Sequence, residues 1–375
     1  MVELLSYLKC TCSKKVIIKS GYLNEEQISW WKKLYYQGLG EFLYRNEIVI
    51  SEEELFDIIV EHEKEEINKI NYEGKGNLIP IGGGKDSNVT LELLKDYENT
   101  PFAINPKDVH LSCINVSGYK DLFSVKRVLD KKLIELNEKG FLNGHTPFSA
   151  LVSFVTYLCA YLSNKKYIVL SNESSANEAT VIGTNVNHQY SKSYEYEKDF
   201  NYYADKYLGL NIKYFSLLRA LNETQIAYLF SKYKKYHEVF KSCNVGSKEI
   251  PWRWCGNCPK CMFVYIILSP YLTDEELVNI FKENLYEKEN LLETFKELLG
   301  LEKTKPFECV GTTKEVRDAV SKALKNRKDL PFLLKYYSDN YPLEEYPLLN
   351  KYNEENFIPD EYQKLLKEEL KCIQE

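Results

Sequence analysis

One short stretch limits the fold of this chain more than any other. Residues 78–95, LIPIGGGKDSNVTLELLK, set three adjacent glycines between a short apolar run and an amphipathic helical pattern. Glycines directly after a strand allow positive φ angles and turn successive N–H groups toward one point, which forms a nest for an anion. The following helix adds its free N–H groups and its dipole, worth about 0.3–1 kcal/mol per favourable charge. The stretch predicts a phosphate-binding loop, and the alternative is a plain glycine-rich turn before a capped helix.

Two familiar phosphate loops do not fit these residues. The nucleotide P-loop needs a lysine followed by Ser or Thr, whereas Lys85 is followed by Asp86 and has no glycine at the required upstream spacing. The dinucleotide fingerprint fits Gly82 and Gly84, but it meets Ser87 where its last glycine belongs. A phosphate site at this loop would therefore belong to another class.

Short apolar runs alternate with helical patterns around and after the glycine loop. We predict strands at NLIPIG, FAIN, VHLSCINVSG and KKYIVLSNE, and helices at 86–98, 121–139 and 146–163. This alternation indicates a parallel sheet covered by helices on both faces. Upstream, KKVIIKSGYL is expected to be a strand and NEEQISWWKKLYYQGLGEFLYRN to be mainly helical. SEEELFDIIVEHEKEE is expected to be a helix that opens with a capping box of Ser51 and Glu54.

These patterns divide the chain into three regions. We expect an α+β lobe over 1–75, an α/β domain over 76–270 that includes a cysteine-rich knuckle at 243–261, and a helical region over 271–375. A chain of 375 residues is too long for one ordinary core and short for three, so its length favours two domains or one large domain with appendages.

Charge and hydropathy exclude several classes of protein. The net charge is −6 and the pI is about 5.7, which argues against a protein that coats nucleic acid. No uninterrupted apolar segment approaches the roughly 20 residues that span a bilayer, and the N-terminus lacks the order of a signal peptide. We therefore expect a cytoplasmic protein without a membrane partner. Nothing in the sequence indicates an oligomeric state.

Four of the ten cysteines are grouped in CNVGSKEIPWRWCGNCPKC. Cys243 is followed, after eleven residues, by Cys255, Cys258 and Cys261 in two overlapping C-x-x-C turns. Four thiolates so spaced can close a tetrahedral site, the arrangement that structural Zn²⁺ prefers. Metal binding worth about 10–16 kcal/mol would then fold the segment. An iron–sulfur cluster uses the same ligands, and four independent buried thiols are the plainer alternative.

An unusually polar segment follows the predicted strand KKYIVL. It offers carboxylates, amides, an imidazole and an ammonium at the carboxyl end of a buried strand, where α/β sheets bind their ligands. The residues concerned are Asn172, Glu173, Asn177, Glu178, Asn187, His188, Gln189, Tyr190, Ser191 and Lys192. A solvated loop could have the same composition, so the residues alone leave both interpretations open.

The glycine loop resembles the S-G-G-x-D-S loop of the ATP pyrophosphatases, with Gly82 in place of the usual serine. In that superfamily the loop holds the pyrophosphate end of ATP, and the enzymes adenylate a carbonyl or carboxylate oxygen. The resemblance implies an α/β fold with a parallel sheet of the adenine nucleotide alpha hydrolase (PP-loop, HUP-like) type, a four-cysteine zinc knuckle, and added N-terminal and C-terminal regions that are mostly helical. It also implies phosphate binding by Gly82, Gly83, Gly84, Lys85 and Ser87, and a Mg²⁺ held by Asp86.

Further blocks narrow the resemblance to one family. The 7-cyano-7-deazaguanine synthases carry a comparable four-cysteine zinc element. The segments WWKKLYYQGLGEF, PIGGGKDS, NGHTPFSA, NESSANE, VNHQYSKS, WRWCGNCPKC and KPFECVGT resemble signature blocks of the ATP-dependent UDP-N-acetylmuramoyl-L-alanyl-L-glutamate epimerases. They run in order from about residue 30 to about residue 320 and so cover most of the chain. The tail after 320 resembles no block, and the chain is shorter than typical members.

The resemblance implies a specific reaction in peptidoglycan precursor synthesis. The terminal L-Glu of UDP-MurNAc-L-Ala-L-Glu would be inverted to D-Glu through an acyl adenylate, with release of AMP and pyrophosphate. A free carboxylate resists loss of the neighbouring proton, because the product would be a dianionic enediolate. Adenylation removes that charge and supplies a carbonyl into which the carbanion delocalises. The expected cofactors are ATP, Mg²⁺ and structural Zn²⁺, and the expected partner is a small nucleotide-sugar peptide.

The inversion also needs proton carriers near the α-carbon, with pKa values near the operating pH. The candidates by residue chemistry are His188, Lys192, Cys309 and Glu178. Each has a plainer alternative: a lone cysteine is more often a small buried hydrophobe, and the lysine could hold phosphate or the substrate carboxylate. Substrate binding is assigned to Glu173, Asn177, Asn187, Gln189 and Ser191, while His145 would either line the nucleotide pocket or cap a helix.

Two other functions remain open at this point. One is an adenylating synthase or ligase similar to 7-cyano-7-deazaguanine synthase, acting on a deazapurine, a tRNA-like molecule or another carboxylate. The other is a nucleotide-sensing module that has lost turnover, which the replacement of serine by Gly82 favours and the retained Asp86 and Ser87 oppose. Formation of D-Glu would distinguish the epimerase from the synthase or ligase. Release of pyrophosphate would distinguish an active enzyme from the sensing module.

Overall fold

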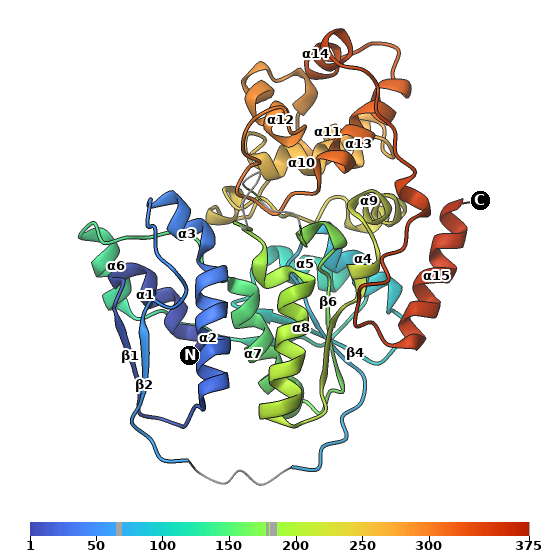
Figure 1. Ribbon diagram of the computed structural model, residues 1–375. Coiled ribbons are helices and arrows are strands. Elements are labelled where there is room, and N and C mark those ends of the chain that lie inside the picture. The colour runs from blue at the N-terminus through green and yellow to red at the C-terminus, as the bar shows by residue number, and fades with distance from the viewer. Residues whose placement is uncertain (65–69, 178–179, 181–185, 375) are drawn as a thin grey trace.

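The computed structural model describes residues 1–64, 70–177, 180 and 186–374 (Figure 1). The strands are β1 (Lys15–Ile18), β2 (Asp57–Val60), β3 (Asn77–Pro80), β4 (Asn99–Ile104), β5 (Phe123–Val125), β6 (Tyr167–Leu170) and β7 (Lys213–Ser216). The first helices are α1 (Leu5–Thr11), α2 (Glu25–Gly38), α3 (Gly40–Arg45), α4 (Lys85–Leu93), α5 (Asp108–Ser117), α6 (Lys131–Glu138), α7 (Phe148–Leu162) and α8 (Tyr194–Tyr203). The others are α9 (Glu223–Lys232), α10 (Pro259–Leu268), α11 (Asp274–Phe281), α12 (Leu292–Leu298), α13 (Thr313–Lys325), α14 (Phe332–Asn340) and α15 (Asp360–Gln374).

A five-stranded sheet lies at the centre, and each of its strands runs parallel to its neighbours. The strand order is β5-β4-β3-β6-β7. The chain moves outward from β3 to β5 and then returns to the other side of β3 to build β6 and β7. The carboxyl ends of β3 and β6 therefore meet where the strand order reverses, which is the position at which open α/β sheets bind ligands.

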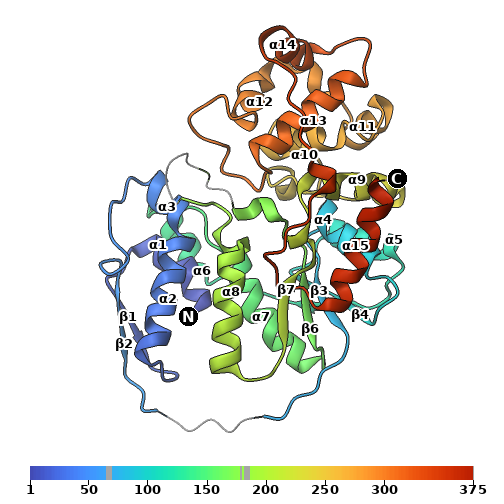
Figure 2. The ribbon, with the colours of Figure 1, turned by 45° about the vertical axis from the view of Figure 1, so that its right-hand side comes forward.

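Both faces of this sheet are buried. Successive side chains on a strand point to opposite faces. Leu78 and Ile168 pack on one face in a core shared with α7 and α8, whereas Ile79 and Val169 pack on the other in a core that includes side chains of α4, α5 and α15. Figures 1 and 2 show these helices on the two sides of the sheet. Burial on both faces explains why the strands are continuously apolar.

The N-terminal lobe packs directly against the helices of the sheet. Its parallel strands β1 and β2 form a separate two-stranded sheet, and α2 carries the aromatic contacts. The Trp31 ring stacks on Phe154 of α7 with centroids 4.9 Å apart, and Trp30 lies 4.5 Å from Tyr203 of α8. The lobe thus shares one hydrophobic core with the sheet.

A layer of helices lies above the carboxyl ends of the strands (Figure 1). Its centre is α10, which is almost wholly buried from Lys260 to Leu268 and contacts α9, α11, α12 and α13. The second hydrophobic core runs from the sheet through this layer to α15. Each hydrophobic core contains residues from more than one of the predicted regions 1–75, 76–270 and 271–375. The limits of these regions stay predictions.

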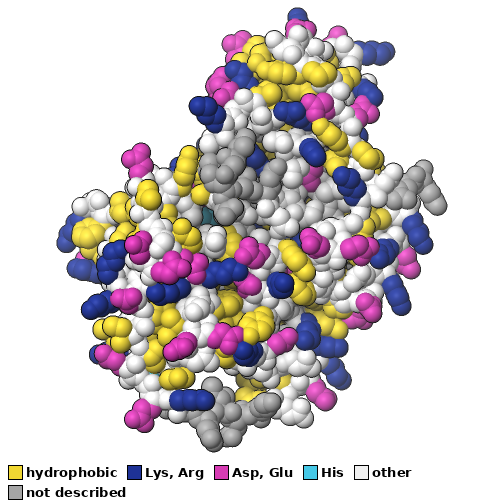
Figure 3. All heavy atoms as spheres, in the orientation of Figure 1, with side chains coloured by type: hydrophobic (Ala, Val, Ile, Leu, Met, Phe, Trp, Pro, Cys, Tyr) yellow, Lys and Arg dark blue, Asp and Glu magenta, His cyan; other side chains and the backbone are white. Residues whose placement is uncertain are grey.

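The outer surface carries charges of both signs. Figure 3 shows Lys and Arg interspersed with Asp and Glu over the face it presents, in keeping with the net charge of −6. None of the helices in the described part of the chain combines the length and apolar character that a bilayer crossing needs.

The structure confirms many of the predicted elements and corrects three. The strands predicted from KKVIIKSGYL, NLIPIG, FAIN and KKYIVLSNE are β1, β3, β4 and β6, and the helices predicted at 86–98 and 146–163 are α4 and α7. The strand predicted at VHLSCINVSG was wrong, because this segment is helix α5. Its buried residues Val109, Cys113 and Ile114 are spaced for one helical face.

Two predicted helices were also wrong in part or whole. The segment 121–139 contains strand β5 before helix α6. In the segment after Ser51, the hydrogen bonds of the capping box with Glu54 do form, but a turn follows and Asp57–Val60 is strand β2. The β-branched run Ile58-Ile59-Val60 pairs with β1, so strand pairing prevails over the helix start signal.

Candidate active site

A cavity of about 350 Å³ opens where the carboxyl ends of β3 and β6 meet. One part of its wall is apolar and is formed by Phe102, Ala103, Ile104, Phe148, Val152 and Leu170. Another part is polar and includes Gly82, Gly84, Asp86, Ser87, Lys192, Lys260 and Cys309. The cavity can therefore take a molecule that has both apolar and charged groups.

The glycine loop supplies the polar floor of this cavity. Gly83 has a φ of +79°, and a Cβ built there would lie 2.9 Å from Cγ2 of Val109. A side chain at this position would be both strained and blocked. At Gly84 a Cβ would lie 3.3 Å from Cβ of Ser242. Helix α4 begins at the next residue, so its N-terminal turn adjoins the cavity, as the phosphate-loop prediction requires.

Lys85 does not lie on the cavity wall. Its side chain is buried, and its ammonium group donates to the carboxylates of Asp86 and Glu223. Burial acts to lower the pKa of Lys85, but the two carboxylates outweigh it and raise that pKa. The Lys85 ammonium is thus neutralised by these two carboxylates, and its ion pair with Glu223 joins α4 to α9. Lys192 and Lys260 present the ammonium groups that line the cavity.

Three of the four predicted proton carriers come together beside the cavity. The Lys192 ammonium donates to Sγ of Cys309 at 3.1 Å. The His188 ring lies close enough to Cys309 for each to shift the pKa of the other, and its Nδ1–H donates to the carboxylate of Glu41 on α3. The result is a chain of four contacting groups, Lys192, Cys309, His188 and Glu41, which we call the thiol cluster. Glu178 lies outside the described residues.

The electrostatics of the thiol cluster favour charged groups. Burial acts to raise the pKa of Cys309, but Lys192 and His188 outweigh it and lower that pKa to about 6. Burial acts to lower the pKa of His188, whereas Cys309 and Glu41 raise it, with a net value of about 9. For Lys192, burial is likewise outweighed by Cys309 and Glu173, and the pKa is raised. At neutral pH the cluster therefore contains a thiolate between two cations.

His145 lies next to the thiol cluster, with its ring 4.2 Å from that of His188. Its Nδ1 is 3.8 Å from the Glu41 carboxylate. Burial, together with the neighbouring His188 cation, lowers the pKa of His145 to about 4. His145 is thus neutral when His188 is charged, and it packs behind that ring.

The five residues predicted to bind substrate lie near the cavity but are absent from its described lining. Three of them hydrogen-bond within the protein. Asn177 accepts from the N–H of Tyr194 at 2.8 Å, Asn187 donates to the carbonyl of Ala176 at 2.9 Å, and Gln189 donates to the carbonyl of Val310 at 3.4 Å. Glu173 and Ser191 are buried. In this state these residues shape the loop that carries His188 and Lys192.

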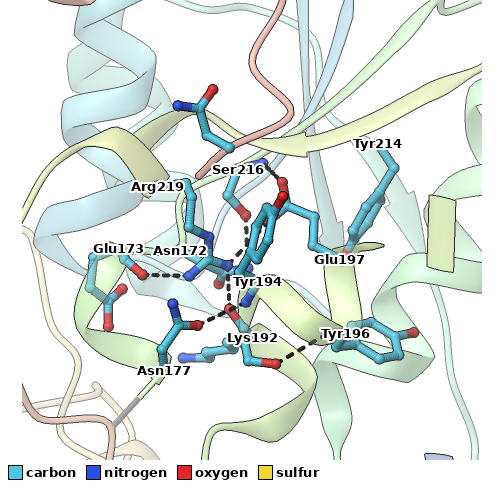
Figure 4. A network of polar contacts seen from close by, with 12 residues as sticks. Asn172, Glu173, Asn177, Lys192, Tyr194, Tyr196, Glu197, Tyr214, Ser216 and Arg219 are labelled. Atoms are coloured by element: carbon cyan, nitrogen blue, oxygen red, sulfur yellow. Dashed lines mark hydrogen bonds and ion pairs between the residues drawn. The ribbon is translucent and has the colours of Figure 1, made fainter. Parts of the chain in front are cut away.

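A buried arginine fixes that loop to the sheet (Figure 4). Arg219, just after β7, is fully buried and donates to the carbonyl of Glu173 at 2.6 Å and to the carbonyl of Lys192. The same guanidinium pairs with the Glu197 carboxylate at 3.2 Å, and that carboxylate accepts from the N–H of Ser216. The backbone of Lys192 is therefore held in place by the end of strand β7.

The four grouped cysteines meet in a geometry suited to a tetrahedral ion. The Sγ–Sγ distances are 3.5 Å for Cys258–Cys261, 3.6 Å for Cys243–Cys258 and 3.7 Å for Cys255–Cys261. A zinc ion about 2.3 Å from each sulfur needs sulfurs about 3.8 Å apart. The N–H of Gly246 also donates to Cys243 Sγ at 3.1 Å, which would offset thiolate charge. Helix α10 begins directly after Cys258.

Four important residues were missed at the sequence level. Glu41 and Lys260 were present in blocks quoted above, GLGEF and CPKC, but their neighbours in space are more than 45 positions away. Arg219 and Glu223 follow β7, a strand that was not predicted. Recognising that strand would have placed both residues at the carboxyl edge of the sheet, where functional side chains gather.

Comparison with known proteins agrees with this geometry. The family models described as the MurL N-terminal domain and the MurL C-terminal domain match residues 1–217 and 239–341. A protein named UDP-N-acetyl-alpha-D-muramoyl-L-alanyl-L-glutamate epimerase from Micromonospora sp. is 34% identical over 326 residues, which is 84% of this chain and 72% of that protein. A protein of the same name from Xanthomonas oryzae pv. oryzae is 35% identical over 326 residues, which is 84% of this chain and 71% of that protein. The chain belongs to the MurL family of epimerases.

Proposed function

We propose that this protein inverts the terminal L-Glu of UDP-MurNAc-L-Ala-L-Glu to D-Glu through an acyl adenylate, consuming ATP and releasing AMP and pyrophosphate. One observation carries the proposal: a single cavity joins the glycine loop and Asp86 to Lys192 and Cys309 of the thiol cluster. Activation of the carboxylate needs the phosphate-binding groups, and exchange of the adjacent proton needs the thiol cluster. Both sets of groups must therefore reach the same end of one bound substrate. The names of the relatives support the epimerisation of this substrate.

The residues fit ATP as the activating substrate. The apolar wall suits the adenine ring, and the glycine backbone with the start of α4 suits the phosphates. We assign phosphate neutralisation to Lys260 and leave Lys85 to its ion pairs with Asp86 and Glu223. Asp86, whose carboxylate is partly exposed to the cavity, would hold Mg²⁺, which withdraws charge from the phosphates when bound. The parallel sheet and its glycine loop support a PP-loop type of fold.

The four-cysteine cluster would hold a structural Zn²⁺ through Cys243, Cys255, Cys258 and Cys261. Its role in the reaction is indirect. The ion would fix the start of α10, from which the Lys260 ammonium donates to the carbonyl of Cys309. Because both substrates are nucleotides of the cell interior, we expect the reaction to take place in the cytoplasm.

Proton exchange is assigned to the thiol cluster. Once the carboxylate is adenylated, the proton on the α-carbon becomes acidic enough for a side-chain base to remove it. Lys192 donates to Cys309 at 3.1 Å and His188 lies close to that thiol, so the groups that can remove and return a proton are gathered at one place. Return of a proton to the opposite face and hydrolysis complete the inversion.

The direct test measures both products. Protein, ATP, Mg²⁺ and UDP-MurNAc-L-Ala-L-Glu are incubated together, pyrophosphate is quantified, and the hydrolysed peptide is analysed on a chiral column. We expect D-Glu and pyrophosphate to appear together. Pyrophosphate without D-Glu would favour the synthase or ligase alternative, and absence of both would favour the sensing module.

Replacing Asp86 with asparagine is expected to slow pyrophosphate release by about 10²–10³-fold, the usual cost of losing one group that stabilises charge in a transition state. D-Glu formation should fall by the same factor, since activation precedes inversion. The matched control is Asp96→Asn, which changes an exposed carboxylate at the end of the same helical segment. Equal rates of pyrophosphate release in the two variants would contradict the role given to Asp86.

A further inference from the structure

The thiol cluster has the arrangement of an activated nucleophile. A nucleophile in contact with an imidazole, which a third group orients in turn, is the recurring pattern of covalent catalysis. Here Cys309 contacts His188, and Glu41 holds Nδ1 of His188 from the N-terminal lobe. Glu41 is itself buried and fixed by Arg45, whose Nε lies 2.7 Å from Oε1 of Glu41.

The position of Cys309 also suits attack on an activated acyl group. Its side chain lines the same cavity as Gly82, Gly84 and Asp86. Its backbone is held from both sides, because the Lys260 ammonium donates to the carbonyl of Cys309 and the Lys305 ammonium donates to the carbonyl of Gly311 at 2.9 Å. The thiol is thus presented to the cavity by a fixed backbone.

We propose that Cys309 accepts the glutamyl group from the acyl adenylate, so that the α-carbon is inverted while it is held as a thioester on the enzyme. The proposal rests on the function proposed above and assigns the covalent step within it.

The steps balance without any further reagent. The Cys309 thiolate attacks the carbonyl carbon, the C–S bond forms, and the C–O bond to AMP breaks with its electron pair leaving on AMP. Lys192 releases its ammonium proton to solvent, and its neutral form then takes the proton from the α-carbon, while a proton from solvent returns to the opposite face of the planar enolate. Water cleaves the thioester to the D-glutamyl carboxylate and the Cys309 thiolate, and its two protons pass to solvent. Lys192 keeps the proton taken from the α-carbon, so the resting pair of thiolate and ammonium is restored.

Acylation itself prepares Lys192 for its task. Before transfer, the thiolate at 3.1 Å stabilises the ammonium form of Lys192. The thioester carries no charge, so its formation removes the Cys309 contribution that raises the pKa of Lys192 and leaves those of Glu173 and Asp86. The pKa of Lys192 therefore falls, and the lysine is a better base once the glutamyl group is in place. A Cys309 thiolate between two cations, by contrast, is a good nucleophile and a weak base.

The test looks for the adduct and for the reaction separately. Enzyme turning over isotope-labelled UDP-MurNAc-L-Ala-L-Glu is quenched in acid within milliseconds, and intact and peptide masses are measured before and after hydroxylamine. The samples are the unmodified protein, Cys309→Ser and the control Cys12→Ser, which changes an exposed thiol away from the cavity. We expect a hydroxylamine-sensitive adduct of substrate minus water on Cys309, and an ester on the serine variant, whose D-Glu formation falls at least about 1,000-fold.

The two proposals fail in different ways. If the unmodified protein and Cys12→Ser form D-Glu and pyrophosphate, but neither the unmodified protein nor Cys309→Ser carries an adduct at residue 309, the thioester is overturned and the epimerase function stands. If no D-Glu forms in any sample, both proposals fall.

Glu41 provides a second, independent readout as a positioning residue. The groups that face Cys309 are Lys192, His188 and Lys260, and those that face His188 are Glu41 and His145. In Glu41→Gln the His188 cation loses its counter-ion, its pKa falls, and the thiolate loses one of its stabilising charges. The acidic limb of the pH profile for adduct formation should therefore move to higher pH. The matched control is Glu53→Gln, which changes an exposed carboxylate of the same lobe. If the acidic limb of this pH profile stays in place in Glu41→Gln while the rate of adduct formation falls, Glu41 has only a structural role.

Discussion

Removing metal from the four-cysteine cluster is expected to unfold the segment from Cys243 to Cys261 and to destabilise the helical layer above the sheet. Metal binding to such sites contributes about 10–16 kcal/mol to folding. Three of the four ligands, Cys243, Cys258 and Cys261, belong to the hydrophobic core that also contains α10. Without the ion, four thiolates in van der Waals range would repel one another, and α10 would lose its fixed start.

The measurements are metal content and thermal unfolding with and without a strong chelator. We expect one zinc per chain and a large fall in the unfolding temperature on chelation. Cys258→Ser should reproduce that fall, whereas Cys159→Ala, which removes a buried thiol on α7, should leave both metal content and chelator sensitivity unchanged. Substoichiometric zinc, a brown iron chromophore, or unfolding indifferent to the chelator would contradict the assignment.

Arg219→Met is expected to lower the free energy of unfolding by about 3–5 kcal/mol, because it leaves the buried Glu197 carboxylate without its partner. The same change removes the donors to the carbonyls of Glu173 and Lys192, so the loop that carries the thiol cluster loses its attachment to β7. We therefore expect D-Glu formation to fall as well, and the fall should persist at temperatures where the variant is fully folded. Denaturant unfolding measures the first effect.

A double variant isolates the cause of the lost stability. Adding Glu197→Leu removes the orphaned charge, and replacement of a buried ion pair by apolar residues is often neutral or stabilising. We expect Arg219→Met with Glu197→Leu to recover much of the stability without recovering the activity. A double variant less stable than Arg219→Met alone would show that the pair matters for packing and not for charge.

The central part of the fold was predictable because its local signals agree with one another. The glycine loop, the apolar strand before it and the helix after it all indicate one strand–loop–helix unit, and the structure contains β3 and α4 in those positions. Around Ser51 the local signals conflict: the capping hydrogen bonds form, yet the β-branched residues after them pair with β1. Pairing with a strand some 40 positions earlier could not be known from that segment by itself.

The candidate site was likewise predictable only in part. His188, Lys192 and Cys309 were selected one by one from their chemistry and from the resemblance, but their contact is a tertiary fact. Lys192 and Cys309 are 117 positions apart, and His188 and Glu41 are 147 apart. The role of Lys85 also depended on tertiary structure, because its partner Glu223 lies 138 positions away. Residue type and resemblance identified candidate residues of the site, and the packing of distant segments determined which of these residues are in contact.

The contact between the two ends of the sheet domain has a consequence for biosynthesis. Tyr362 of α15 donates to Oδ1 of Asn77 at the start of β3 at 2.8 Å, and its ring packs on Tyr167 and Phe215. These partners are 285 positions apart, so at about 5–20 residues per second the first strand waits roughly 15–60 s for its cover to emerge from the ribosome. After β6 and β7 have emerged, the nascent chain exposes the apolar surface of Tyr167 and Phe215 until Tyr362 follows to cover it.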